Sequence, residues 1–511
     1  MNAENLRHFL FKNADALLAA AIGFLVIYLF TRYGGIGVSP DSIVYASVAR
    51  HLHEGHGLTE FTNRPVVDFP VFYPIFLSLV LFITGQDVIV FAPLLNSLLF
   101  AIAIFLCGYI IENFVNRSKI YKWILLCCIV ISPTLLEVYS MLWSETIFII
   151  LSLLFFITLK KYLRHHSIPS LVGMSVIAAL AFDTRYAGIT LIGTGGLLIL
   201  LDKNSTWVKR LTHLFIFVLI SISLALLNLI RNSLTTGFAA GMRQKGVTTL
   251  SKNIEYFAGV VYDWVGFFGS HHLFVLFIGI AVMGIFILVF IVRTISHENY
   301  ESYENITGAF FIIYASFILL SSTISRYETI NSRLLSPAMI PFFWGITYKI
   351  PAWINSIRTP VPKWTARILV TAVILGYLIV QSGWDKENFD NINESGIPGY
   401  TEDTWEQSPT ILYIKKDTAL FNPHKLVYSN TNYGIYFYTG KITESLPERV
   451  HYKEVKEFFK ENNYYLIWFD TDVNPDLLNL DEIGRRKKMT LLHSFSDGAI
   501  YYCTNDSTAV N

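Results

Sequence analysis

Apolar runs long enough to cross a lipid bilayer recur along the first three quarters of this chain, and short polar loops separate them. A spanning helix needs about 20 predominantly apolar residues. We expect spans near residues 14–33, 91–111, 123–141, 144–160, 170–183, 186–201, 212–231, 273–293, 306–323, 334–348 and 367–383. Only 15% of the residues are charged, against about 25% in an ordinary soluble domain. The pattern therefore predicts an α-helical polytopic membrane protein.

Basic residues in the short loops predict how these spans are oriented. Lysine and arginine gather near residues 119–122, 160–164, 203–210 and 349–363, which lie on one face if the spans are right. Because cytoplasmic loops carry an excess of these residues, that face and the N-terminus should be cytoplasmic. The eleven expected crossings are an odd number, so the C-terminal region should lie outside the cytoplasm.

One apolar segment, residues 70–84, is shorter than the others and is followed by Gly85. If it crossed the membrane, every later basic loop would turn to the outside. Apolar segments of this length are often interfacial or re-entrant. We therefore expect a juxtamembrane or re-entrant helix on the outer face.

The composition changes abruptly after Gln381, and residues 384–511 are polar. Strand-like runs at 425–429, 464–469, 490–495 and 499–503, with a helical stretch at 455–462, predict a small α/β domain. Residues 432–434 are typical of a turn, and no glycine-rich nucleotide-binding loop follows a strand. We therefore divide the chain into a membrane domain, 1–383, with its first outer loop at 34–90, and an extracytoplasmic domain, 384–511.

Ionisable side chains gather in the loops expected on the outer face. Such groups are costly near a bilayer and indicate a functional site by default. Carboxylates come early, at Asp41 and Glu145, whereas arginines dominate later, at Arg185 and Arg333 among others. Because the planar fork of arginine suits phosphate, this order predicts an acid–base carboxylate beside a phosphate-bearing ligand. A net charge of +1 without a basic stripe argues against a nucleic-acid partner.

Each candidate also has a purely structural interpretation. Asp41 follows Ser39-Pro40 at a good helix start and could act as a cap, and Glu145 opens an apolar helix and could interact with its dipole. Arg185-Tyr186 lies in a tight turn between two short spans and could be an interfacial anchor. The other carboxylates of the first loop are expected to be solvated: Glu54, Glu60 and Asp68.

Short motifs spread along the chain carry a resemblance to a known family. In the first loop they are Asp41, Tyr45, Ala49, Gly55 and Gly57, then Pro65, Phe69-Pro70 and Tyr73-Pro74. Later they are Ser144-Glu145, Thr184 to Gly188, Arg231-Asn232 with Gly237, Arg333 with Pro337, and Tyr428 to Asn430 with Thr439-Gly440 and Leu446-Pro447. In this order they resemble the GT-C superfamily of membrane glycosyltransferases, whose bacterial branch has an outer C-terminal domain.

The resemblance implies an enzyme of the bacterial inner membrane. It would take a sugar, hexosyl or pentosyl, from a polyprenyl phosphate or diphosphate and transfer it to an envelope lipid, glycan or protein at the outer face. Relatives include the aminoarabinose transferases of lipid A, which carry a lysine where this chain has Val67-Asp68-Phe69. They also include protein O-mannosyltransferases, which show paired acids where Asp41 is followed by Ser42.

Such a reaction needs a base for the acceptor and positive charge for the departing lipid phosphate. We expect Asp41 to be the base, with Glu145 as the second candidate. The phosphate would be bound by Arg185 with Tyr186, by Arg243 and by Arg333, and the loop contacting donor and acceptor would include Tyr45 and Tyr73. A divalent metal could do the work of the arginines, but the carboxylates do not cluster tightly enough to require one.

Two other classes of function compete with this interpretation. A transporter or flippase of a lipid-linked sugar would show inverted repeats and polar residues near the bilayer midplane. We find no convincing internal repeat, and the ionisable residues lie toward the outer face. An envelope scaffold would use the membrane region only as an anchor, for which eleven spans are excessive.

Overall fold

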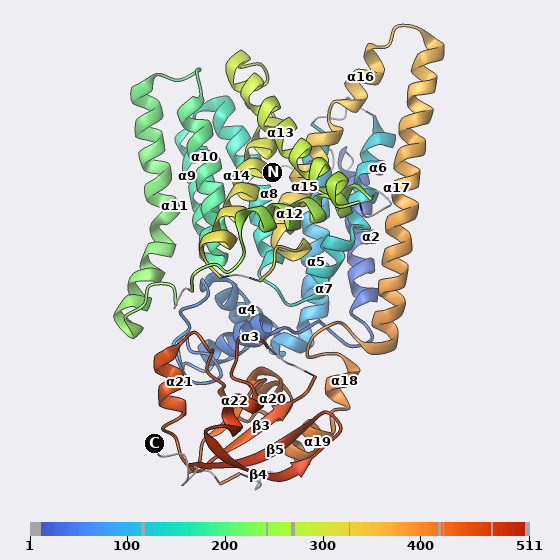
Figure 1. Ribbon diagram of the computed structural model, residues 1–511. Coiled ribbons are helices and arrows are strands. Elements are labelled where there is room, and N and C mark those ends of the chain that lie inside the picture. Colours follow the sequence, from blue (N-terminus) through green and yellow to red (C-terminus); the bar gives the residue numbers. More distant parts are fainter. Residues whose placement is uncertain are drawn as a thin grey trace.

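The chain forms a bundle of long helices with a small sheet domain packed against one end (Figure 1). The architecture is that of a computed structural model, which describes residues 12–113, 118–241, 244–266, 271–326, 328–416, 421–422, 424–471 and 474–505. The predicted fold class is confirmed: a helical polytopic membrane protein with a small C-terminal α/β domain.

Six helices among the described residues are long and apolar enough to cross a membrane. They are α5 (Val88–Ile111), α8 (Glu145–His165), α11 (Trp207–Thr236), α13 (His272–Ser296), α14 (Tyr303–Ile324) and α17 (Pro360–Ser395). A seventh candidate is the pair α6 (Lys119–Val130) and α7 (Pro133–Ser140), which is bent by 51°. A proline begins α7, and it has no amide hydrogen with which to continue the hydrogen bonds of α6.

The other four expected spans fall on shorter helices: α2 (Ala14–Phe30), α9 (Ile168–Thr184), α10 (Ile189–Leu201) and α15 (Ser332–Thr347). These helices have 13 to 17 residues, below the roughly 20 of a standard span. By length, then, the structure supports six or seven of the eleven expected crossings. An apolar run in a sequence does not reveal whether lipid or protein surrounds it, so the predicted orientation stays a prediction.

The first loop contributes two helices, α3 (Pro40–His53) and α4 (Phe72–Thr84), which lie between the bundle and the sheet domain (Figure 1). Helix α3 begins with a capping box, in which the Ser39 hydroxyl accepts from the Ser42 amide and the Ser42 hydroxyl accepts from the Ser39 amide. Helix α4 leaves Phe82 and Ile83 largely exposed. Shorter elements complete the membrane part: η1 (Tyr186–Gly188), α12 (Leu250–Val265) and α16 (Ile350–Ser356).

The C-terminal domain is built on a five-stranded sheet in the order β2-β1-β3-β5-β4. The strands are β1 (Val427–Ser429), β2 (Glu444–Ser445), β3 (Tyr464–Phe469), β4 (Lys487–Ser494) and β5 (Gly498–Asn505). Strand β1 runs parallel to β2 and β3, whereas β5 is antiparallel to β3 and β4. The helices are α18 (Asp403–Glu406), α19 (Pro409–Lys416), α20 (Asn432–Thr439), α21 (Tyr452–Phe458) and α22 (Leu480–Gly484).

The predicted strands are all present, but the turn predicted at residues 432–434 is wrong because these residues begin helix α20. Ile435 of this helix packs on Ile467 and Phe469 of β3. This tertiary contact overrides the turn preference of the local sequence. The change to a polar composition near residue 384 falls inside helix α17, which continues to Ser395.

Specific contacts dock the sheet domain against the first loop. Phe61 stacks on Tyr436 with ring centroids 4.4 Å apart, and the Tyr400 amide donates to the Val38 carbonyl at 2.8 Å. Arg326, in the loop before α15, forms an ion pair with Asp476 of the sheet domain. The sheet domain thus contacts both the start of α3 and the loop before α15, and these two segments carry residues of the site described below.

Candidate active site

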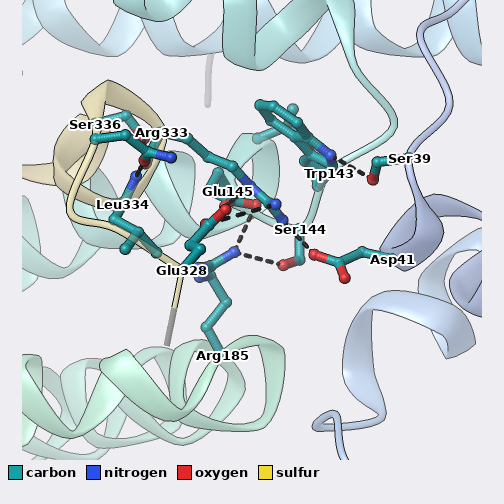
Figure 2. Close-up of polar contacts among 12 residues, drawn as sticks. Ser39, Asp41, Trp143, Ser144, Glu145, Arg185, Glu328, Arg333, Leu334 and Ser336 are labelled. Atoms are coloured by element: carbon teal, nitrogen blue, oxygen red, sulfur yellow. Dashed lines mark hydrogen bonds and ion pairs between the residues drawn. The ribbon is translucent and has the colours of Figure 1, made fainter. Parts of the chain in front are cut away.

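Four chain segments that are far apart in the sequence meet at the end of the bundle nearest the sheet domain (Figures 1 and 2). Asp41 lies in the first turn of α3, Glu145 is the first residue of α8, Arg185 follows the end of α9, and Arg333 lies in the first turn of α15. Helix ends leave backbone polar groups without intrahelical partners, so charged side chains are tolerated there better than along an apolar helix.

Glu145 is the centre of the charge network. Its side chain is fully buried, with 0% exposed. Its Oε2 lies 2.5 Å from Arg185 Nη1, and its Oε1 accepts from Arg333 Nε at 2.8 Å. Arg185 Nη1 also donates to the Ser144 hydroxyl at 3.0 Å. With both oxygens occupied, Glu145 fixes the direction of two guanidinium groups.

The Asp41 carboxylate points toward Arg333 (Figure 2). Its Oδ2 accepts from Arg333 Nη2 at 2.5 Å, and the Asp41 side chain remains 28% exposed. The Arg333 guanidinium stacks on Trp143, with Cζ 4.1 Å from the ring centroid. The Trp143 indole in turn donates to the Ser39 hydroxyl at 2.9 Å. Ser39, and not Asp41, therefore caps helix α3 with its side chain.

Two further side chains border the network. Glu328 Oε1 lies 3.7 Å from Arg333 Nη1. Partial removal from water raises the pKa of the Glu328 carboxyl above its ordinary value, against the opposing effect of Arg333. The Tyr45 hydroxyl lies 3.4 Å from the Ser144 hydroxyl, and burial raises the pKa of Tyr45 well above its ordinary value. Tyr45 is therefore a neutral hydrogen-bonding group at physiological pH.

The charged side chains border a cavity of about 370 Å³. Its polar wall includes Asp41, Tyr45, Asp68, Arg185, Tyr186, Glu328 and Arg333. Its apolar wall includes Phe69 and Pro70 of the first loop and Phe317 and Ile318 of α14. The cavity therefore has a charged wall, with both arginines and three carboxylates, opposite an apolar one.

The structure brings together six of the predicted site residues: Asp41, Tyr45, Glu145, Arg185, Tyr186 and Arg333. Tyr73 does not line the cavity, because it is fully buried and packs edge-on against Tyr45, with ring centroids 5.0 Å apart. Arg243 lies outside the described residues. Asp68 is exposed as expected, whereas Glu60, expected to be solvated, is only partly exposed and burial raises its pKa.

Sequence reasoning missed two residues of the network, Trp143 and Glu328. Trp143 was adjacent to a candidate in the chain, and the preference of arginine for aromatic faces was a usable signal. Glu328 carried no such signal, because only the folded loop before α15 brings it to Arg333. Among the described residues, no three histidine, cysteine, aspartate or glutamate side chains form a group that could hold a metal ion.

Comparison with known proteins identifies the fold. The sequence matches no protein-family model and no curated protein sequence. Among solved structures, ArnT from Cupriavidus metallidurans bound to undecaprenyl phosphate is similar over 96% of this chain and 98% of its own, with a TM-score of 0.56 and 11% identity. The chain has the GT-C fold.

Two other structures with the GT-C fold are similar over nearly the whole chain. The archaeal oligosaccharyltransferase AglB from Archaeoglobus fulgidus, in complex with an inhibitory peptide and a dolichol-phosphate, has a TM-score of 0.55 at 11% identity, covering 98% of this chain and 75% of AglB. The mycobacterial arabinofuranosyltransferase AftD has a TM-score of 0.50 at 12% identity, covering 96% of this chain and 40% of AftD. At these identities the likeness establishes the fold.

Proposed function

We propose that this protein is a glycosyltransferase that transfers a sugar from a polyprenyl-phosphate donor to an envelope lipid, glycan or protein. The observation that carries the proposal is a cavity of a GT-C fold that is lined by two arginines, Arg185 and Arg333, with the carboxylate of Asp41 beside Arg333. Structures of this fold support it: ArnT holds undecaprenyl phosphate and AglB a dolichol-phosphate.

The two arginines are the proposed site for the donor phosphate. Arginine binds phosphate oxygens bidentately, and both guanidinium groups are held in place by Glu145. Three carboxylates, Glu145, Asp41 and Glu328, already contact these two arginines. A donor phosphate must therefore displace one of these contacts. The contact of Glu328 with Arg333 is the longest, at 3.7 Å, and the raised pKa of Glu328 favours its neutral form. Phosphate would therefore replace Glu328 first.

Asp41 is the proposed general base. An acceptor hydroxyl or amine would attack the anomeric carbon, forming one bond to that carbon while the bond from the carbon to the phosphate oxygen breaks. Asp41 would take the acceptor proton, and the polyprenyl phosphate would leave with its negative charge held by Arg185 and Arg333. Glu145 is buried between the arginines and would position them without contacting the substrate.

The cavity is proposed to open on the outer side of a bacterial inner membrane, with the N-terminus in the cytoplasm. The basic loops support this orientation, and Asp41 of the cavity lies on α3, which stands between the bundle and the sheet domain (Figure 1). A reporter that is active only outside the cytoplasm, fused after Asn505, should be active. Activity of a cytoplasmic reporter at that position would contradict the orientation.

The function is tested by comparing envelope glycolipids and glycoproteins from cells with and without the protein. Mass spectrometry should show a sugar that is lost without the protein and restored by the parent chain, but not by the chain with Asp41→Asn. If a lipid-linked sugar instead accumulates on one side of the membrane while all glycoconjugates are unchanged, the protein is a flippase and the proposal fails.

A further inference from the structure

A second and larger cavity, of about 880 Å³, lies beside the catalytic one. It is bordered by α7, the ends of α12 and α17, the start of α15 and the segment 397–405. Its volume is in the range of cavities that hold a small ligand, roughly 300–1,000 Å³. Nothing in the proposed role of Asp41 and the arginines uses this space.

Near Asp41 and Arg333, only a thin wall of side chains separates the two cavities. Trp143 lines the large cavity, and Arg333, which stacks on it at 4.1 Å, lines the catalytic one. Likewise, Pro40 borders the large cavity and its neighbour Asp41 borders the catalytic cavity. A molecule in the large cavity would therefore lie next to the segment that carries the proposed base.

The charged residues that line the large cavity are all acidic. They are Glu137 and Asp263, and none of the described lining residues is lysine, arginine or histidine. An anionic group in this cavity would meet two carboxylates, which is unfavourable at short range. The nearby cation Arg333 lies behind Trp143 and is already paired with Asp41 and Glu145. A neutral or ammonium-bearing molecule would meet good hydrogen-bond acceptors.

A buried amide in the same wall indicates a ligand with hydrogen-bond acceptors. Gln381 of α17 lines the cavity and is 2% exposed, yet its Nε2 has no hydrogen-bond partner among the described residues. A buried donor left unsatisfied is costly, so a bound group that accepts from it would be favoured. The aromatic side chains of Trp264, Tyr377 and Trp384 also line this cavity.

We propose that the large cavity binds the acceptor, and that the acceptor presents a neutral or amine-bearing glycan and not a phosphorylated or otherwise acidic one. This inference rests on the proposed glycosyltransferase function, because it assigns the second substrate of that reaction. Gln381 donates to a sugar oxygen, Glu137 and Asp263 accept from sugar hydroxyl or ammonium groups, and the aromatic rings pack on the sugar.

The test measures binding of three probes to the purified full chain by saturation-transfer NMR, in a detergent without a sugar headgroup. The probes are the neutral trisaccharide of N-acetylglucosamine, its de-acetylated triamine form, and a glucosamine trisaccharide that carries a phosphate. The neutral and amine probes should bind, and the phosphorylated probe should not. Equal binding of the phosphorylated probe, or no binding of any probe, would overturn the inference.

Amino-acid substitutions test whether the probes bind in the large cavity. Gln381→Leu removes the amide donor and should weaken the neutral probe by about tenfold, the scale of one hydrogen bond. The control is Ser382→Ala on the same helix, because Ser382 is exposed and its hydroxyl donates to the Leu378 carbonyl. Glu137→Lys combined with Asp263→Lys should reverse the preference and admit the phosphorylated probe.

Binding of undecaprenyl phosphate is measured on the same samples, in order to distinguish a failure of this inference from a failure of the proposed transferase function. It should be unchanged in every variant, which also reports that each variant is folded. If Gln381→Leu weakens undecaprenyl phosphate and not the trisaccharide, the large cavity holds lipid and the inference is wrong. If the trisaccharide binds as expected but no polyprenyl phosphate binds at all, the glycan site stands while the proposed transferase function fails.

Discussion

Replacing Asp41 with asparagine separates catalysis from stability at the proposed active site. The amide keeps the shape of the side chain and an oxygen that accepts from Arg333, which also keeps its 2.8 Å hydrogen bond to Glu145. An ion pair is replaced by a hydrogen bond from the charged guanidinium to a neutral amide oxygen, a difference of about 1 kcal/mol. Helix α3 keeps its cap, because Ser39 supplies it.

The same substitution removes the proton acceptor. General bases typically contribute about 10²–10⁴-fold to a rate, so transfer by Asp41→Asn should fall by two orders of magnitude or more. The assay is transfer of a radiolabelled sugar from a polyprenyl-phosphate donor in proteoliposomes, with undecaprenyl phosphate binding and thermal unfolding measured in parallel. Binding should be retained or tighter, because a negative charge beside Arg333 is removed, and the melting temperature should change little.

Glu54→Gln is the matched control, since it removes a carboxylate from the same loop at an exposed position that does not line the cavity. It should transfer sugar at the parent rate. If Asp41→Asn also does so, Asp41 is not the base, and the residue to test next is Glu328, the other carboxylate that lines the cavity at Arg333. Glu145, with both oxygens occupied by arginines, is less suited to accept a proton.

Three further predictions concern the charges around the cavity. Arg185→Ala and Arg333→Ala should each weaken undecaprenyl phosphate binding at least tenfold, with only partial rescue by lysine, which lacks the bidentate fork; unchanged affinity would assign both to interfacial anchoring. Glu328→Gln should tighten that binding severalfold, because it removes a competing negative charge, and weaker binding would instead make Glu328 a donor contact. Arg326→Asp and Asp476→Arg should each lower stability by roughly 1 kcal/mol in thermal unfolding and reduce transfer, and the double charge swap should restore both. Failure of the swap would show that this ion pair does not hold the loop before α15 in place.

The sequence alone determined that the protein is a helical membrane protein with a small C-terminal α/β domain, and it supplied the candidate residues of the site. Runs of apolar residues and a low charged fraction require a nonpolar environment whatever the tertiary structure, so the helical membrane domain was predictable. Four of the five described strands were predictable for a similar reason, because runs of apolar β-forming residues are separated by turn residues, whereas the two-residue strand β2 carried no such pattern. Ionisable side chains in the outer loops drew attention to this face, and the resemblance to the GT-C superfamily singled out Asp41, Glu145, Arg185 and Arg333 among them.

Only the tertiary structure decided which of these residues contact one another. Glu145 and Arg333 are 188 positions apart in the chain, yet they form a hydrogen bond of 2.8 Å, and no local pattern encodes such a pairing. The same holds for the helix at residues 432–439 and for the large cavity, both of which depend on contacts between distant segments. Hydrophobic periodicity reports the environment of one element at a time, whereas a charge network is a property of how several elements pack. The residue types could therefore be predicted, but their partners, burial and access to the two cavities could not.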